Sequence, residues 1–261
     1  MPVSELSAVA AIAERDLMKF LRDRPRLIGT FIFPFLLMGL MGGTLQLNLG
    51  KAAGFNFIGF TFTGILGLTI FQSSAQGIAS ILEDRQNDFA QEIFVSPISR
   101  YSIVIGKIAG ESMVALAQAA PLIGFALVLQ VPLTAEQVAL MAPVAVISCL
   151  VGGSFGLVAM ALINNQQAAP TIFNFLLLPQ FFLAGVFNPI AVLPWYLEVL
   201  SRISPMRYVV DLFRGIVYTG RPEYHKVVLL DPLTNLAVMI VMFAVFITVG
   251  TALFVRRETN R

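Results

Sequence analysis

Long apolar segments constrain the fold of this chain more than any other feature of its sequence. Each is long enough for a helix of about 20 residues, which one crossing of the hydrocarbon core of a bilayer requires. Backbone N–H and C=O groups find no water there, so every crossing must be helical. The sequence therefore predicts an all-α polytopic membrane protein with spans at residues 27–45, 57–82, 103–131, 138–163, 171–187 and 233–255.

The composition agrees with a membrane protein. Of the 261 residues, 57% are hydrophobic and only 12% are charged, whereas soluble domains use about 45–50% apolar residues. The net charge is +2, and the Lys and Arg residues are scattered at the edges of apolar runs, so we expect no nucleic-acid partner. Cys149 is the only cysteine, which excludes an internal disulfide.

The distribution of basic residues predicts the orientation of the spans. An even number of crossings places both termini on one side, and the side richer in Lys and Arg is cytoplasmic. Basic residues gather before the first span, after the second and in the tail: Arg15, Lys19, Arg22, Arg24, Arg26, Arg85, Arg100, Lys107, Arg256, Arg257 and Arg261. We therefore expect cytoplasmic termini, although the last outer loop also carries basic residues.

Two segments outside the spans have amphipathic patterns. Residues 4–24 carry apolar side chains at helical spacing among charges, which predicts a helix that lies on the membrane surface or against a partner. Between the second and third spans, residues 81–100 read ILEDRQNDFAQEIFVSPISR. Leu82, Phe89 and Ile93 share one side of a helix there, and the charges lie on the other side. This pattern predicts a short acidic cytoplasmic helix over residues 83–98 that acts as a lever; a solvated loop is the alternative.

The long outer loop, residues 188–231, is cut by prolines into pieces too short to cross a membrane. The pieces at Ile190–Val192 and Trp195–Leu200 are apolar enough to be re-entrant, and such breaks persist at membrane depth only where protein buries them or where they line a cavity. This favours a gate formed by Asn188, Pro189, Leu193, Pro194 and Trp195. The alternative is an interfacial belt of Trp and Tyr side chains.

Charged residues within and next to the spans suggest two ion pairs. Glu111 follows Lys107 by one helical turn, so the two side chains are expected to pair. Arg207, Asp211 and Arg214 also follow at helical spacing and could pair along one face; we interpret them as a structural ion pair, and a substrate site is the alternative.

Neutral polar and aromatic residues in the spans suggest a path for an amphipathic or apolar cargo. The predicted lining residues are Phe71, Gln72, Gln76, Asn174, Phe175 and Phe182. Each of them alone is more often a helix–helix contact than a ligand contact.

The motifs of common enzymes give little support for catalysis. Gly152–Gly156 matches G-x-S-x-G, but a nucleophilic serine needs a base, and the single histidine, His225, is far along the chain. We interpret the match as a helix-packing seam; a membrane enzyme that uses Ser154 is the alternative. The sequence contains no G-x-x-x-x-G-K-[ST] loop and no metal-ligand cluster, so we expect no metal or cofactor in this chain, and ATP only on another subunit.

The order of these parts resembles the ABC-2 type permeases of ATP-binding-cassette exporters over essentially the whole chain. The most specific stretches are DFAQEIFVSPISRYSIVIGK, which ends at Lys107, and the patterns N-P-x-x-x-L-P-W and S-P-M-R-Y-x-x-D-x-x-R between Asn188 and Arg214. The closest likeness is to bacterial permeases of the daunorubicin-resistance type. Nodulation-factor and polysaccharide export permeases come next.

The resemblance implies a bacterial plasma-membrane permease that works as two permease chains with two ATPase subunits, which bind ATP and Mg²⁺. In this chain it implies a connecting helix at 4–24, a coupling helix at 83–98 and gate helices in the outer loop. The residues implied to dock on the ATPase are Arg85, Asp88, Phe89, Glu92, Phe94 and Pro97. The second chain is expected to be an identical copy or a similar permease.

The expected function is outward movement of a drug-like, lipid or glycolipid/polysaccharide substrate by alternating access, driven by the ATPase subunit. The main alternative is a channel or an ion-coupled carrier that works without ATP. That alternative needs intramembrane charges, for which Glu111 is the candidate.

Overall fold

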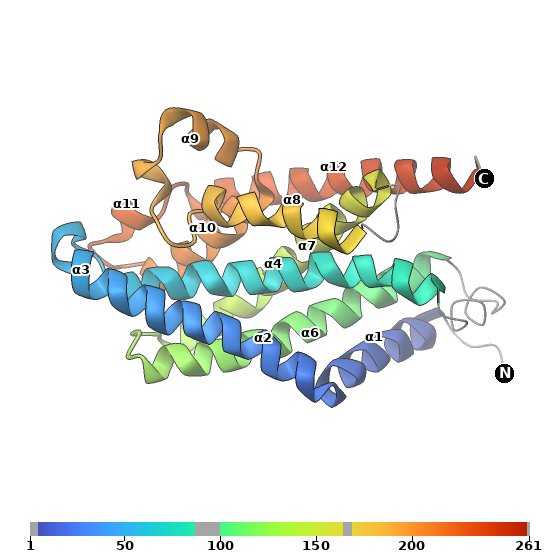
Figure 1. Cartoon of the computed structure of the whole chain (residues 1–261), viewed down its shortest axis with the longest axis horizontal. Helices are drawn as coiled ribbons and strands as arrows, with labels where there is room; N and C mark the ends of the chain where they lie inside the picture. The colour runs from blue at the N-terminus through green and yellow to red at the C-terminus, as the bar shows by residue number, and fades with distance from the viewer. Residues whose placement is uncertain (1–4, 87–99, 164–168, 260–261) are drawn as a thin grey trace.

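The computed structural model describes residues 5–86, 100–163 and 169–259. Within these residues all regular secondary structure is helical, which confirms the predicted fold class. Long helices lie side by side, and α1 (Glu5–Arg22) and the end of α12 (Pro232–Thr259) lie at the same end of the bundle (Figure 1). We call this the terminal end and the opposite one the far end.

Among the described residues, five helical stretches are long and apolar enough to cross a membrane. The first is Leu27–Ala53, longer than predicted, formed by α2 (Arg24–Leu36), the π-helix η1 (Leu37–Gly42) and α3 (Gly43–Ala53). The other four lie in α4 (Phe57–Gln86), α6 (Arg100–Val128), α7 (Ala135–Leu162) and the stretch Tyr224–Leu253, which joins the short α11 (Tyr224–Val227) to α12.

The predicted fifth span is shorter than the sequence suggested. Helix α8 (Ala169–Leu183) has 15 residues, about 22 Å of helix at 1.5 Å per residue, against about 30 Å of hydrocarbon core. It ends because Gly185 adopts a left-handed φ of 67°, while Gly185 N–H donates to the Phe182 carbonyl and Val186 N–H to the Phe181 carbonyl. Such a glycine cap terminates a helix, so the span predicted to reach Phe187 stops four residues earlier.

Other helix boundaries follow local capping chemistry. Thr134 begins α7 with a capping box, in which its hydroxyl accepts from Gln137 N–H and the Gln137 side chain accepts from Thr134 N–H. Helix α4 continues through Glu83 to Gln86, so these residues form its last turns and do not begin a separate helix as predicted. The rest of the predicted 83–98 helix, residues 87–98, lies outside the described residues.

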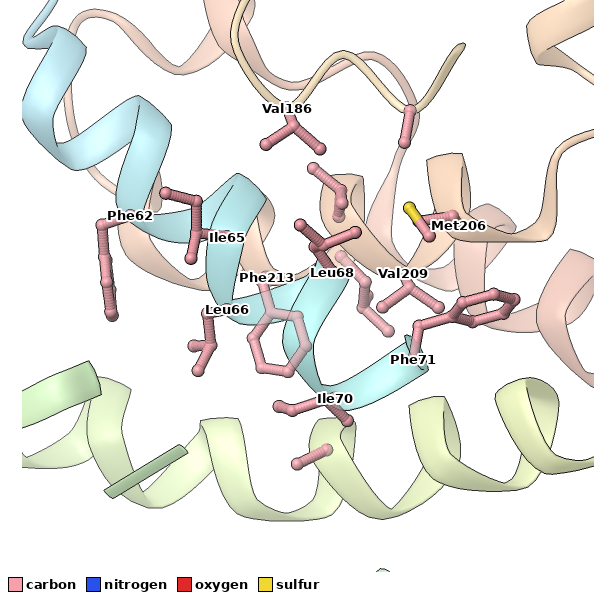
Figure 2. Packing of buried hydrophobic residues seen from close by; sticks show 14 of the residues in the cluster. Phe62, Ile65, Leu66, Leu68, Ile70, Phe71, Val186, Met206, Val209 and Phe213 are labelled. Atoms are coloured by element: carbon pink, nitrogen blue, oxygen red, sulfur yellow. The ribbon is translucent and has the colours of Figure 1, made fainter. Parts of the chain in front are cut away.

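Helix α4 forms the centre of the bundle. It packs against α6, α7 and α10 (Pro205–Tyr218). Its most apolar 18-residue stretch is 83% buried. Figure 2 shows Leu68 and Phe71 of α4 close to Met206, Val209 and Phe213 of α10, and Ile70 on the side of α4 turned toward α7. With Phe62, Ile65, Leu66 and Val186 they belong to one buried hydrophobic cluster. By contrast, the most apolar 18-residue stretches of the first span and of Tyr224–Leu253 are each only 11% buried. Much of their apolar surface is therefore left for lipid or another chain.

Glycines let the backbones of α4 and α7 approach closely. A Cβ atom on Gly152 would lie 2.6 Å from the Phe71 carbonyl oxygen, and one on Gly156 would overlap the Ala75 carbonyl oxygen. Between them Ser154 is buried and donates to the Val151 carbonyl of its own helix (2.9 Å). The G-x-S-x-G match is therefore a packing seam, as predicted.

We expect Gly156→Ala to lower the free energy of unfolding by about 1–3 kcal/mol, because the added methyl group must push α4 away from α7. The matched control is Gly124→Ala in α6, where nothing lies within 4 Å of the added Cβ. Thermal unfolding of both variants in detergent measures the difference. Equal melting temperatures for the two variants would contradict the seam.

Candidate functional site

The terminal end holds both ends of the predicted ATPase-docking segment. Helix α4 ends at Gln86 and α6 begins at Arg100 near α1 (Figure 1). Of the predicted docking residues, Arg85 lies in the last turn of α4. The other five, Asp88, Phe89, Glu92, Phe94 and Pro97, lie outside the described residues.

A buried charge cluster lies between α1 and α6 at this end. The Lys107 Nζ atom is 2.9 Å from Asp16 Oδ2 and 3.6 Å from Glu111 Oε1, and all three residues are buried. The second distance confirms the predicted Lys107–Glu111 pair. Sequence reasoning missed Asp16, although its signal was present: it lies three residues after Ala13 and four before Phe20, on the apolar face of α1.

The predicted pathway residues fall into two settings. On α4, Phe71 is fully buried and its ring lies 5.5 Å from that of Phe155, so it contacts the protein core; Gln72 is half-buried and Gln76 is exposed. On α8, Asn174, Phe175 and Phe182 are exposed, and Phe175 and Phe182 show 72% and 64% of their surface. Phe175 and Phe182 lie seven residues, about two turns, apart and share one side of α8, whereas Asn174 is turned about 100° from Phe175.

The predicted gate segment forms short helical pieces, as the prolines suggested. Residues Ile190–Val192 form the 3₁₀ turn η2, and Trp195–Ser201 form α9. Ile190 is buried below the Gly185 turn, which fixes the start of the segment. Pro189 and Leu193 are half-buried, whereas Asn188, Pro194 and Trp195 are exposed, Trp195 to 77%.

After this segment the chain enters the core. All residues of α10 except Ile216 are buried, which sequence reasoning missed because it treated 188–231 as one outer loop. Pro205 at the first position of α10 starts the helix. At its other end, the Gln137 side chain donates to the Ile216 and Val217 carbonyls, each at 3.1 Å, which satisfies the end of the helix.

Charged residues of α10 hold three neighbouring segments and do not pair with one another as predicted. Asp211 accepts from the N–H groups of Leu229 (2.8 Å) and Leu230 (3.0 Å) and from Asn235 Nδ2 (2.7 Å), which ties α10 to the start of α12. Arg214 donates to the Gly185 carbonyl, and its guanidinium lies 3.7 Å from the centre of the Phe60 ring.

The third charged residue, Arg207, donates to the Ser201 hydroxyl at the end of α9. The predicted ion pair within α10 is not formed as a direct contact. Helical spacing shows which side chains share a face, but it does not show the competing partners that distant segments supply.

Comparison with known proteins identifies a family that this sequence matches. The sequence matches the family described as ABC-2 type transporter over residues 7–218. It is 29% identical over 138 residues to the probable multidrug ABC transporter permease YbhR of Escherichia coli, a match that covers 52% of this chain but only 37% of YbhR.

Two further relatives match over more of their length. The inner membrane transport permease YadH of Escherichia coli is 22% identical over 79% of this chain and 81% of YadH. The putative transport permease ycf38 of Cyanophora paradoxa is 23% identical over 74% of this chain and 69% of ycf38. The family is a membrane permease domain without a nucleotide-binding site. From the matched stretch, which runs from α1 to the end of α10, we conclude that this multi-pass membrane protein belongs to the ABC-2 type transporter family.

Proposed function

We propose that this chain is the permease subunit of an ATP-driven exporter in a bacterial inner membrane. The observation that carries the proposal is the family match over residues 7–218. The names of YbhR and YadH, a multidrug ABC transporter permease and an inner membrane permease, support the activity and the location.

Energy comes from a separate ATPase subunit, which binds ATP and Mg²⁺. The 261-residue sequence has no phosphate-binding loop of the G-x-x-x-x-G-K-[ST] type, so transport needs a partner that has one. That partner docks at the terminal end, on the segment 83–98, with Arg85, Asp88, Phe89, Glu92, Phe94 and Pro97 as its contacts. The terminal end is then cytoplasmic, in agreement with the basic residues that gather there.

The pathway forms between two permease chains. In the described part of one chain, Phe175 and Phe182 of α8 show most of their surface, and the neighbouring Asn174 is also exposed. A second copy, or a similar permease, placed against this side would enclose a path lined by aromatic rings and amides. Such a lining suits an amphipathic cargo that is drug-like, lipid or glycolipid, and an anthracycline of the daunorubicin class is the first candidate.

The gate is the segment of η2 and α9 at the far end. It is anchored at Ile190 and through the Arg207–Ser201 hydrogen bond, while the side chains of Asn188, Pro194 and Trp195 are exposed. Helix α10, which Asp211 and Arg214 hold in the core, is the fixed base on which this segment moves.

We expect Phe89→Ala with Glu92→Ala to abolish ATP-dependent export, because the permease no longer engages its ATPase. The measurement is daunorubicin efflux, followed by its own fluorescence, from proteoliposomes that contain the chain and its ATPase; a fluorescent phospholipid serves as the second probe. Glu136→Gln, an exposed acid at the start of α7, is the control for charge loss. Export that persists without ATP would refute the proposal and favour a channel or a carrier.

Trp195→Ala should lower export without a change in stability, whereas Asp211→Ala should lower stability. Trp195 is exposed, so its removal should leave the melting temperature unchanged and lower export. Loss of Asp211 leaves three donors without their acceptor and should lower the free energy of unfolding by about 2–4 kcal/mol. Thermal unfolding with an export assay separates the two; normal export by Trp195→Ala would contradict the gate.

A further inference from the structure

Helices α1 and α6 pack with their backbones close together. A Cβ atom on Gly106 would lie 3.0 Å from Ile12 Cβ and 3.2 Å from the Val9 carbonyl oxygen. One turn later, a Cβ atom on Gly110 would lie 3.0 Å from Asp16 Cβ and 3.2 Å from Ala13 Cα. The two helices therefore run in the same direction, and small residues on α6 form the surface on which α1 rests.

An ion pair is buried within this contact. Asp16 Oδ2 lies 2.9 Å from Lys107 Nζ, and both side chains are at least nine-tenths buried. The other carboxylate oxygen of Asp16 accepts from the Arg15 guanidinium at 2.8 Å. Lys107 also faces Glu111 at 3.6 Å, so among the described contacts cations and carboxylates alternate from Arg15 through Asp16 and Lys107 to Glu111.

The cluster reaches α4 as well. The Glu111 side chain occupies the space above Gly77, where any Cβ atom would overlap it. Gly77 is nine residues before the end of α4. The group of charges thus has members on α1 and on α6, and it packs against α4. It lies at the end of the bundle where α1 lies (Figure 1).

Buried charge and apolar packing differ in what they allow. Apolar contacts are non-directional and specify a register only through the shapes that interlock. A buried ion pair fixes one register, because a shift of one turn would separate charges that water no longer solvates.

We propose that Asp16 is a positioning residue that locks α1 onto α6, so that α1 and the adjoining parts of α6 and α4 move as one rigid arm during transport. The inference rests on the proposed function, in which an ATPase acts at this end. The arm transmits the movement of the ATPase to the spans, and the Asp16 ion pair prevents α1 from sliding on α6 and so losing part of that movement.

A disulfide tests the geometry directly. Cys149 is the only cysteine and is buried, so a Cys149→Ala background is free of native thiols. In that background, Ile12→Cys with Gly106→Cys should cross-link rapidly in membranes under mild oxidation, because the two Cβ positions are 3.0 Å apart before relaxation. The matched control is Leu6→Cys with Gly106→Cys, since Leu6 is 83% exposed. A control pair that cross-links as fast would overturn the fixed register.

Export per ATP hydrolysed tests the role of Asp16. Asp16→Asn should lower this ratio about tenfold, within the range expected for residues that couple two sites, with ATP hydrolysis retained. Glu14→Gln, the exposed acid two residues earlier, should change it less than about twofold. The conservative variant Asp16→Glu, which keeps the carboxylate beside Arg15 and Lys107, should retain more of the ratio than Asp16→Asn.

The decisive experiment combines the two changes. In Asp16→Asn, the engineered disulfide that joins α1 to α6 through Ile12→Cys and Gly106→Cys should restore the ratio to within about twofold of the Cys149→Ala chain. The reason is that a covalent tether replaces the ionic one, so reduction of the disulfide should remove the rescue. Export blocked by this disulfide in the presence of Asp16 would show that α1 must slide on α6 and would overturn the inference.

Failure of the proposed function has a different signature. A Cys149→Ala chain that exports neither daunorubicin nor the fluorescent phospholipid with its ATPase would refute the exporter. The cross-linking rates would still report on the arm, because Asp16→Asn should slow formation of the engineered disulfide about tenfold without any partner. Unchanged cross-linking in Asp16→Asn would count against the lock itself.

Discussion

The contact of α4 with α7 and α10 is the interaction on which the rest of the structure depends. Gly152 and Gly156 of α7 meet carbonyl groups of α4, and Gly67 of α4 meets Val210 of α10. In a bilayer, apolar side chains gain little by leaving lipid for protein, so close packing and hydrogen bonding must hold helices together. Once α4 is enclosed, α6 and α12 have fixed surfaces to pack on, and the first span and α12 are left with outward apolar faces.

The fold class and most of the crossings could be predicted because hydropathy and the cost of unpaired backbone groups are local properties. The short α8 could not, since its end depends on the left-handed conformation of Gly185. The burial of α10 was missed for a related reason: its sequence is amphipathic, but the surfaces that cover its polar groups come from α4, α8 and α12. The Lys107–Glu111 pair was predictable from spacing alone, whereas Asp16 meets Lys107 across 91 residues of chain.

The buried charged residues of α10 hold neighbouring segments together. Asp211, Arg214 and Arg207 each bind a different neighbouring segment, and Gln137 and Tyr218 do the same at the far end, where Tyr218 donates to the Asn56 carbonyl. Each bond satisfies a backbone or side-chain group that would otherwise be unpaired away from water. Phe175 and Phe182 of α8 and Trp195 of α9, by contrast, expose most of their surface.

The π-helix in the first span has a geometric effect beyond its own six residues. A π turn holds one residue more than the α turn it replaces, and one residue corresponds to about 100° of rotation in an α-helix. Before the π turn, the side of the span that carries Phe35 faces Phe125 of α6. The extra residue rotates the rest of the span, so that Gly42 faces Ile58 and Thr61 of α4. Deletion of one residue between Leu37 and Gly42 would let the span become a regular α-helix. It would then turn a different stripe of α3 toward α4 and carry the Gln46 side chain away from the Phe57 N–H that it now accepts from.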